Sequence, residues 1–124
     1  MFDALLIMST VNLYGLPYCD ATQAVIKWFE EKGIETHLHN YKTDGISREK
    51  LQEWSSQLGW EKLLNKRSTT WRSLSKEKQD KVVDETSAID IMLQNSSLIK
   101  RHVIESGKDL LLGFDEKKLN NTFK

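Results

Sequence analysis

The sequence predicts an α/β domain built on a four-stranded mixed sheet. The first observation is a strand–helix–strand pattern near the N-terminus, which indicates parallel pairing because a long crossover joins the two strands. The second is a series of short helical patterns between residues 60 and 100. The third is a β-hairpin pattern followed by one helix at the C-terminal end. The order β-α-β, helical insertion, β-β-α closes a mixed sheet with helices beside it.

The N-terminal strands and helix follow from hydrophobic spacing. Residues 11–14 read as a short strand, and residues 34–41 alternate with period two as a half-buried strand does. A helix is expected over residues 20–32, ended by Gly33 in a left-handed cap. Its apolar side chains fall on one side at helical spacing: Ala24, Val25, Trp28 and Phe29.

The helical insertion is delimited by residues that begin and end helices. Ser47 is predicted to begin a helix that ends at Gly59. Ser75 is predicted to cap a second helix, and Thr86 or Ser87 a third. The sequence therefore predicts several short helices between the two halves of the sheet.

The C-terminal part is predicted to complete the sheet. Residues 102–112 read as a β-hairpin with a two-residue turn at Ser106 and Gly107. A last helix is expected from Asp115, which would cap it, to the C-terminus.

Length suggests one domain. The 124 residues are enough for a continuous core, and we assign residues 9–124 to that single domain. Met8 is a plausible start, so residues 1–8 are interpreted as an N-terminal extension or a start-site artefact. This apolar stretch is too short to span a bilayer and carries an acid where a signal peptide carries basic residues.

Charge and cysteine content restrict the function. The 18 basic and 18 acidic residues balance, which removes a global electrostatic argument for binding nucleic acid or a membrane. The single cysteine excludes an internal disulfide and fits a reducing compartment. We therefore expect a cytoplasmic monomer that binds neither nucleic acid nor membrane.

Cys19 is the candidate reactive residue. It follows a Gly/Pro turn and lies at the start of the predicted helix, where unpaired N–H groups and the helix dipole favour thiolate over thiol. Asp20 is expected to cap that helix, because a carboxylate beside a thiolate raises the thiol pKa and so does not activate it. Free cysteines also commonly lie buried as small hydrophobic residues, so residue types alone leave both roles open.

Four segments in order make the pattern specific: Cys19-Asp20 after a Tyr-Gly turn, Asn-Lys-Arg-Ser-Thr-Thr-Trp-Arg at 65–72, Leu-Ile-Lys-Arg at 98–101, and Gly-Lys leading to Leu-Leu-Gly-Phe at 107–114. Together they resemble the arsenate-reductase-like family, the ArsC/Spx/YffB group of thioredoxin-like proteins. The Leu-Gly-Trp-Glu segment at 58–61 is most similar to the YffB branch, for which a glutathione-dependent thiol reductase activity has been proposed.

The resemblance implies a set of site residues. By motif, Cys19 matches the nucleophile, Arg67 the first oxyanion-binding arginine and Arg101 the second, and Thr22 supplies a substrate-binding hydroxyl. The implied protein is an oxidoreductase without a bound cofactor, a glutathione-dependent thiol-disulfide reductase. Glutathione would be its co-substrate, and glutaredoxin or a small thiol or disulfide its partner.

Four positions depart from the family pattern. Phe114 stands where the family has its third arginine, Gly15 where it has a histidine, and Gln23 where it has another arginine. The lost cations argue against arsenate reduction. After Arg101 the family usually has a proline with a cis peptide, whereas this chain has His102. We expect a trans bond there and a changed docking loop, because a cis bond before a non-proline residue costs about 2.5 to 4 kcal/mol.

Two alternative functions remain. The first is arsenate reduction itself. The second is a non-catalytic regulator similar to Spx, which binds RNA polymerase. Thr22 occupies the position of the second cysteine in the C-x-x-C switch of Spx proteins, so the switch is missing.

No metal site is expected. His37 and His39 share one strand face, but neither His102 nor another residue supplies an apparent third ligand. The tryptophans are expected to pack in the core rather than to stack on bases: Trp28, Trp54, Trp60 and Trp71.

Overall fold

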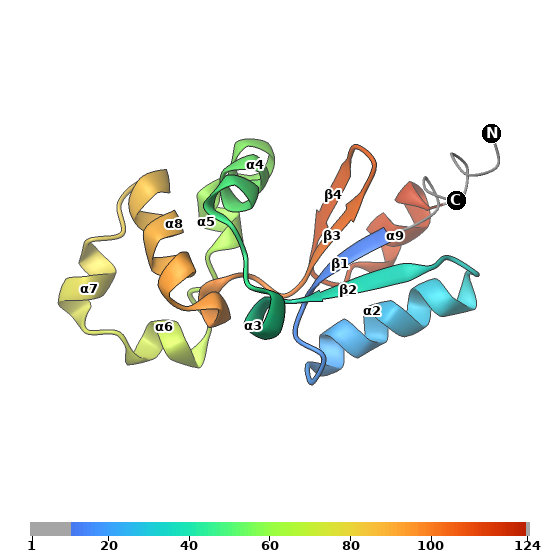
Figure 1. Cartoon of the computed structure of the whole chain (residues 1–124), viewed down its shortest axis with the longest axis horizontal. Coiled ribbons are helices and arrows are strands. Elements are labelled where there is room, and N and C mark those ends of the chain that lie inside the picture. Colours follow the sequence, from blue (N-terminus) through green and yellow to red (C-terminus); the bar gives the residue numbers. More distant parts are fainter. Residues whose placement is uncertain (1–10, 124) are drawn as a thin grey trace. The chain divides into compact units, whose positions relative to one another are not determined.

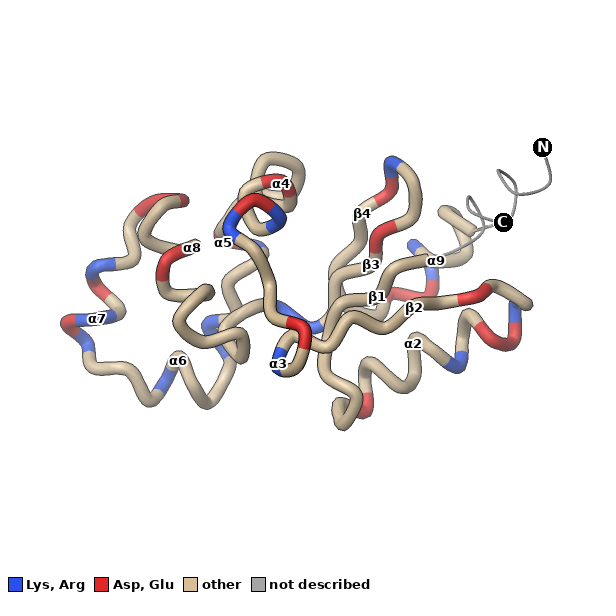
Figure 2. The backbone as a smooth tube through the Cα atoms, viewed as in Figure 1, with Lys and Arg blue, Asp and Glu red and all other residues tan. Residues whose placement is uncertain are grey.

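The computed structural model describes residues 11–123, which form two compact units (Figure 1). One unit comprises residues 11–44 and 101–123, and the other comprises residues 45–100. The proposed N-terminal extension, residues 1–8, lies outside the described residues. Figure 2 shows basic and acidic residues mixed along each unit.

The first unit contains a four-stranded sheet in the order β2-β1-β3-β4. β1 runs parallel to β2, with Leu13 opposite Leu38, and antiparallel to β3, with Leu13 opposite Ile104. β3 and β4 form the C-terminal hairpin. The predicted mixed α/β sheet is therefore confirmed, with strands β1 (Val11–Gly15), β2 (Thr36–Asn40), β3 (Val103–Ser106) and β4 (Asp109–Leu112).

Three helices belong to this unit: α2 (Asp20–Glu31), α3 (Tyr41–Asp44) and α9 (Glu116–Thr122). One apolar cluster joins α2 and α9 to the sheet: Val11, Leu13, Val25, Trp28, Phe29, Ile104 and Leu119. The ring of Phe29 lies edge-on to Phe123 with a centroid distance of 5.0 Å. The spacing predicted for α2 correctly placed Val25, Trp28 and Phe29 on the packing side of the helix. Ala24 was wrongly included: it is exposed, and Thr22, one turn before Val25, is buried instead.

Two chain reversals in this unit involve glycines with positive φ. Gly33 follows α2 with φ of 71°, as predicted. In the hairpin, Ser106 pairs with Asp109, so the turn consists of Gly107 and Lys108 rather than Ser106 and Gly107. The prediction was wrong by one residue because Gly107, with φ of 57°, occupies the first position of the turn, where a left-handed backbone favours glycine.

The second unit is helical, as predicted for the insertion. Its helices are α4 (Arg48–Leu58), α5 (Trp60–Leu63), α6 (Thr69–Ser73), α7 (Lys76–Asp80), α8 (Glu85–Gln94) and the 3-10 helix η1 (Ser96–Leu98).

Three of the four tryptophans of the chain, Trp28, Trp54 and Trp71, are buried as expected, while Trp60 is half-buried.

The predicted serine caps are confirmed at α4 and α7. Ser47 Oγ accepts a hydrogen bond from the N–H of Lys50 at 3.1 Å, and Ser75 Oγ accepts one from Lys78 at 3.2 Å.

At α8 the prediction of Thr86 or Ser87 as the cap was wrong. Asp84 is the N-cap and accepts a hydrogen bond from the N–H of Ser87 at 2.9 Å. Ser87 Oγ accepts a hydrogen bond from the N–H of Asp84 in return. The two residues therefore form a capping box, with Asp84 as the N-cap and Ser87 as the third residue of the helix.

Within residues 11–123, no helix combines the length and the apolar character that crossing a membrane requires.

The packing of β1 can be tested at Leu13, whose fully buried side chain belongs to the cluster that joins the sheet to α2 and α9. Leu13→Ala should lower the free energy of unfolding by about 2 to 5 kcal/mol, because it leaves a cavity in the core. Asn12→Ala, on the exposed side of the same strand, is the matched control and should change it by less than about 0.5 kcal/mol. Denaturant unfolding of both variants measures the difference, and equal losses would contradict this packing.

Candidate active site

Cys19 is the N-cap of α2. Its backbone is extended, with φ of −86° and ψ of 124°, and its carbonyl accepts the N–H of Gln23 at 3.0 Å. The described part of the chain provides no side-chain hydrogen bond that caps this helix. Asp20 therefore does not cap it as predicted, because it is already the first helical residue. The thiol itself occupies the position where capping oxygens usually lie.

The turn before Cys19 is held against α2 by two hydrogen bonds. The N–H of Cys19 donates to the carbonyl of Leu16 at 3.1 Å, and Gln23 Nε2 donates to the carbonyl of Pro17 at 2.8 Å. Between these anchors Tyr18 remains 95% exposed. Gln23, which stands where the resembled family has an arginine, thus has a structural role here.

The surroundings of Cys19 favour its thiolate. Partial burial on its own raises the pKa of the thiol. The N–H and hydroxyl of Thr22, the N–H of Ala21 and the charge of Arg101 act in the other direction. Together they outweigh burial and hold the pKa of Cys19 below its usual value.

Thr22 lies beside the thiol in the first turn of α2 and is fully buried. Its hydroxyl forms no well-aligned hydrogen bond with any group of the described residues. A buried hydroxyl without a well-aligned partner is costly, and the nearby Cys19 thiolate is a group to which it can donate.

Gly15, the last residue of β1, allows two other segments to approach it. A Cβ at this position would lie 2.9 Å from Thr22 Oγ1 and 3.3 Å from His102 Cβ. A larger side chain would therefore displace Thr22 or His102. The glycine that replaces the family's histidine is required by packing in this chain, which the sequence alone did not indicate.

The peptide bond between Arg101 and His102 is cis, so the prediction of a trans bond was wrong. His102 is fully buried, and its carbonyl accepts the N–H of Gly113 at 2.8 Å. The prediction considered only the local preference of the peptide and could not include these tertiary contacts.

The imidazole of His102 is buried, and neither ring nitrogen has a well-aligned hydrogen-bond partner among residues 11–123. Burial lowers its pKa from 6.5 to about 4. The backbone of Gly113, which lies near the ring without a well-aligned hydrogen bond, opposes this effect. His102 is therefore neutral at pH 7 and adds no cation to the site.

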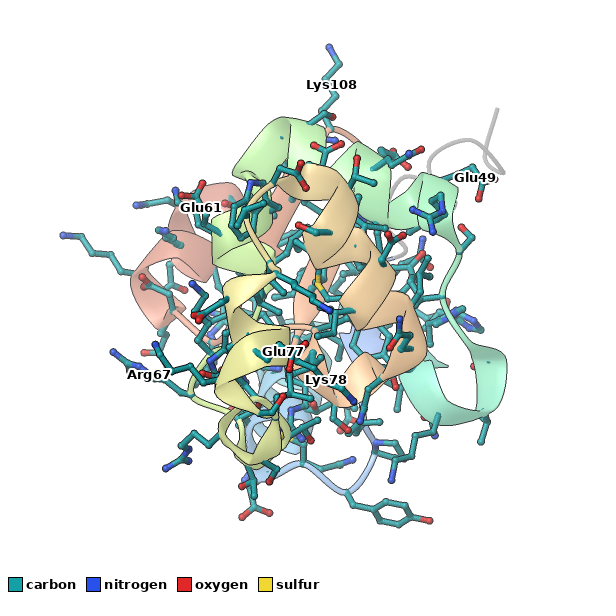
Figure 3. All side chains as sticks on the ribbon, turned by 90° about the vertical axis from the view of Figure 1, so that its left-hand side faces the viewer. Glu49, Glu61, Arg67, Glu77, Lys78 and Lys108 are labelled. Atoms are coloured by element: carbon teal, nitrogen blue, oxygen red, sulfur yellow. The ribbon has the colours of Figure 1, made fainter. Side chains whose placement is uncertain are left out.

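The two predicted arginines lie in different units. Arg101 is half-buried in the first unit, where its charge lowers the pKa of Cys19. Arg67 is exposed in the second unit, and its side chain extends away from the ribbon (Figure 3). Its backbone is held by Asn65 Oδ1, which accepts its N–H at 3.1 Å, and by Arg72 Nη2, which donates to its carbonyl at 2.8 Å. The first unit thus brings together Cys19, Thr22 and Arg101.

Metal ligands do not gather in the part of the chain that the structure describes, where no group of three or more His, Cys, Asp or Glu residues could hold an ion. What the first unit offers is a thiol with lowered pKa, adjacent hydrogen-bond donors and one cation. These features suit nucleophilic attack by sulfur.

The sheet order and the cysteine at the start of α2 define a thioredoxin-like protein whose chain has one cysteine. The chain belongs to the ArsC family, whose family model matches residues 14–122.

Three relatives illustrate this relationship. An uncharacterised protein of Haemophilus influenzae is 37% identical over 113 residues, which cover 91% of this chain and 98% of that protein. The solved structure of the YFFB protein has a TM-score of 0.87 at 35% identity, covering 92% of this chain and 99% of that one. The global transcriptional regulator Spx of Streptococcus pyogenes is 25% identical over 111 residues, covering 88% of this chain and 81% of that protein.

The buried imidazole predicts a pH-dependent stability. As the pH falls from 6.5 towards 4, the unfolded chain binds a proton at His102 before the folded chain does, so stability decreases. In the wild type, this proton should lower the free energy of unfolding by up to about 3 kcal/mol over that pH range. In His102→Phe this part of the loss should be absent, as measured by denaturant unfolding at several pH values. His37→Phe, at an exposed position, should leave it in place. Parallel curves for wild type and His102→Phe would contradict the prediction.

The hydroxyl of Thr22 should contribute to the reactivity of Cys19. Thr22→Val keeps the shape of the side chain and removes the hydroxyl, so the pKa of Cys19 should rise and alkylation at pH 7 should slow several-fold. Thr22→Ser should retain most of the wild-type rate. Equal rates for the two variants would show that only the backbone of α2 acts on the thiol.

Proposed function

We propose that the protein is a glutathione-dependent thiol-disulfide reductase that uses Cys19 as its single redox sulfur. The observation that carries this proposal is the lowered pKa of Cys19 at the N-cap of α2, where the N–H groups of Ala21 and Thr22 and the Thr22 hydroxyl favour the thiolate. A thiolate at neutral pH is the species that attacks disulfides.

The reaction has two exchange steps. In the first, the Cys19 thiolate attacks one sulfur of a disulfide, a Cys19 mixed disulfide forms, and the other sulfur leaves as a thiolate that takes up a proton. In the second, a glutathione thiolate attacks the sulfur bound to Cys19 and releases Cys19 as a thiolate. When the first step leaves glutathione on Cys19, the second produces oxidised glutathione.

An external thiol is needed because Cys19 is the only cysteine of the chain. Thr22 stands three residues after it, where a C-x-x-C protein has its resolving cysteine. Arg101 would stabilise the thiolate before attack and again as it leaves. We assign Arg67 to binding an anionic group of the substrate, on the strength of its motif.

Arsenate reduction is less well supported by the same residues. A doubly charged oxyanion needs several cations, and each missing charge-assisted contact loses about 1.5 to 3 kcal/mol. Phe114 supplies none, Gly15 has no room for a larger side chain, and Gln23 is bonded to Pro17.

A regulatory role is the second candidate, favoured by the match to Spx over 88% of the chain. It would not require chemistry at Cys19. Retention of RNA polymerase by immobilised Cys19→Ser protein would support this role, and absence of binding by both wild type and variant would oppose it.

The decisive experiment for the reductase combines alkylation and mass spectrometry. The alkylation rate of Cys19 is measured against pH, and the protein is then exposed to oxidised glutathione, with Cys19→Ser as control. We expect a pKa below the ordinary value and one glutathione per chain in the wild type alone. An ordinary pKa together with no adduct would refute the proposal.

A further inference from the structure

Large apolar side chains are exposed at three places in residues 11–123: Tyr18 at 95%, Val83 at 71% and Phe114 at 44%. Val83 belongs to the second unit, whereas Tyr18 and Phe114 both belong to the unit that contains Cys19. Exposed aromatic rings next to a reactive group commonly mark a binding surface.

Tyr18 is exposed because the turn around it is fixed. It directly precedes Cys19 and follows Pro17. The N–H of Cys19 donates a hydrogen bond to the carbonyl of Leu16, and the side chain of Gln23 donates one to the carbonyl of Pro17. The ring therefore belongs to the residue directly before the thiol and stays exposed without packing into the core.

Phe114 adjoins the other segment of the site. It follows Gly113, whose N–H donates to the carbonyl of His102 at 2.8 Å. His102 in turn follows Arg101, whose charge acts on Cys19. Phe114 is thus connected to the site through a single backbone hydrogen bond.

An acidic residue lies close to each of these rings in the sequence. Asp20 is exposed in the first turn of α2, next to Cys19, and Asp115 is exposed next to Phe114. In this unit Arg101 is the arginine that acts on the thiol. A partner with acidic groups next to its disulfide would meet two carboxylates and two aromatic rings, whereas an apolar partner would bury the rings.

We propose that the substrate of Cys19 is a disulfide carried on a peptide with apolar or aromatic neighbours, selected by Tyr18 and Phe114. This inference rests on the reductase function proposed above and specifies its substrate class. For a cysteine joined to glutathione, Cys19 attacks the glutathione sulfur, the Cys19–glutathione disulfide forms, and the peptide thiolate leaves and takes up a proton. A second glutathione then restores Cys19 and becomes oxidised glutathione.

The test uses two peptides of equal length, each with one cysteine joined to glutathione. In one peptide the neighbours of the cysteine are leucine and phenylalanine, and in the other they are glutamates. The release of peptide thiol by the full chain with glutathione present gives a rate constant for each, and the apolar peptide should react at least about tenfold faster.

Variants assign this preference to the two rings. Tyr18→Ser and Phe114→Ser should each lower the rate ratio about threefold to tenfold, the range for an aromatic contact. Phe114→Arg should lower it further by favouring the glutamate peptide. Val83→Ser, which removes an exposed apolar side chain of the second unit, is the matched control and should leave the ratio unchanged.

The outcomes separate the two proposals. If oxidised glutathione modifies Cys19 but both peptides react equally fast, or the ratio survives the Tyr18→Ser/Phe114→Ser double substitution, the substrate inference is wrong and the reductase function stands. If Cys19 reacts with neither oxidised glutathione nor either peptide, the reductase function is wrong and the substrate inference falls with it.

Discussion

The candidate site depends on a close approach at the end of β1. Gly15 has no side chain, and the space where a Cβ would lie is bounded by Thr22 Oγ1 at 2.9 Å and His102 Cβ at 3.3 Å. This contact fixes the first turn of α2 and the segment before β3 at one strand end. The N–H groups that act on Cys19 and the charge of Arg101 can therefore operate on one sulfur.

The site obtains its electrostatic character mainly from backbone and neutral groups. Thr22 and Ala21 act on the thiol through their N–H groups, while the imidazole of His102 is kept uncharged by burial. Such dipoles stabilise one thiolate without creating the cluster of cations that a multiply charged oxyanion requires. Within the first unit, Arg101 is the arginine that adds its charge to these dipoles.

The sequence predicted what depends on neighbours along the chain and missed what depends on neighbours in space. Hydrophobic period and capping serines identified the four-stranded mixed sheet, α2 and the short helices, and the turn before Cys19 placed the thiol at a helix start. The cis bond before His102 was not predictable because it runs against the local preference of the peptide, and the role of Gly15 was not because it involves His102, far along the chain. The cap at Asp84 was missed because a serine three residues later also fits a capping pattern.

The single cysteine has a consequence for how oxidation changes this molecule. A chain with two cysteines can close a disulfide within itself, which alters its shape while its composition stays almost the same. Here any disulfide of Cys19 includes a second molecule, so the oxidised protein differs in mass, volume and surface charge. Because the exposed Tyr18 directly precedes Cys19, a group attached to the sulfur would change the surface at this turn together with its redox state.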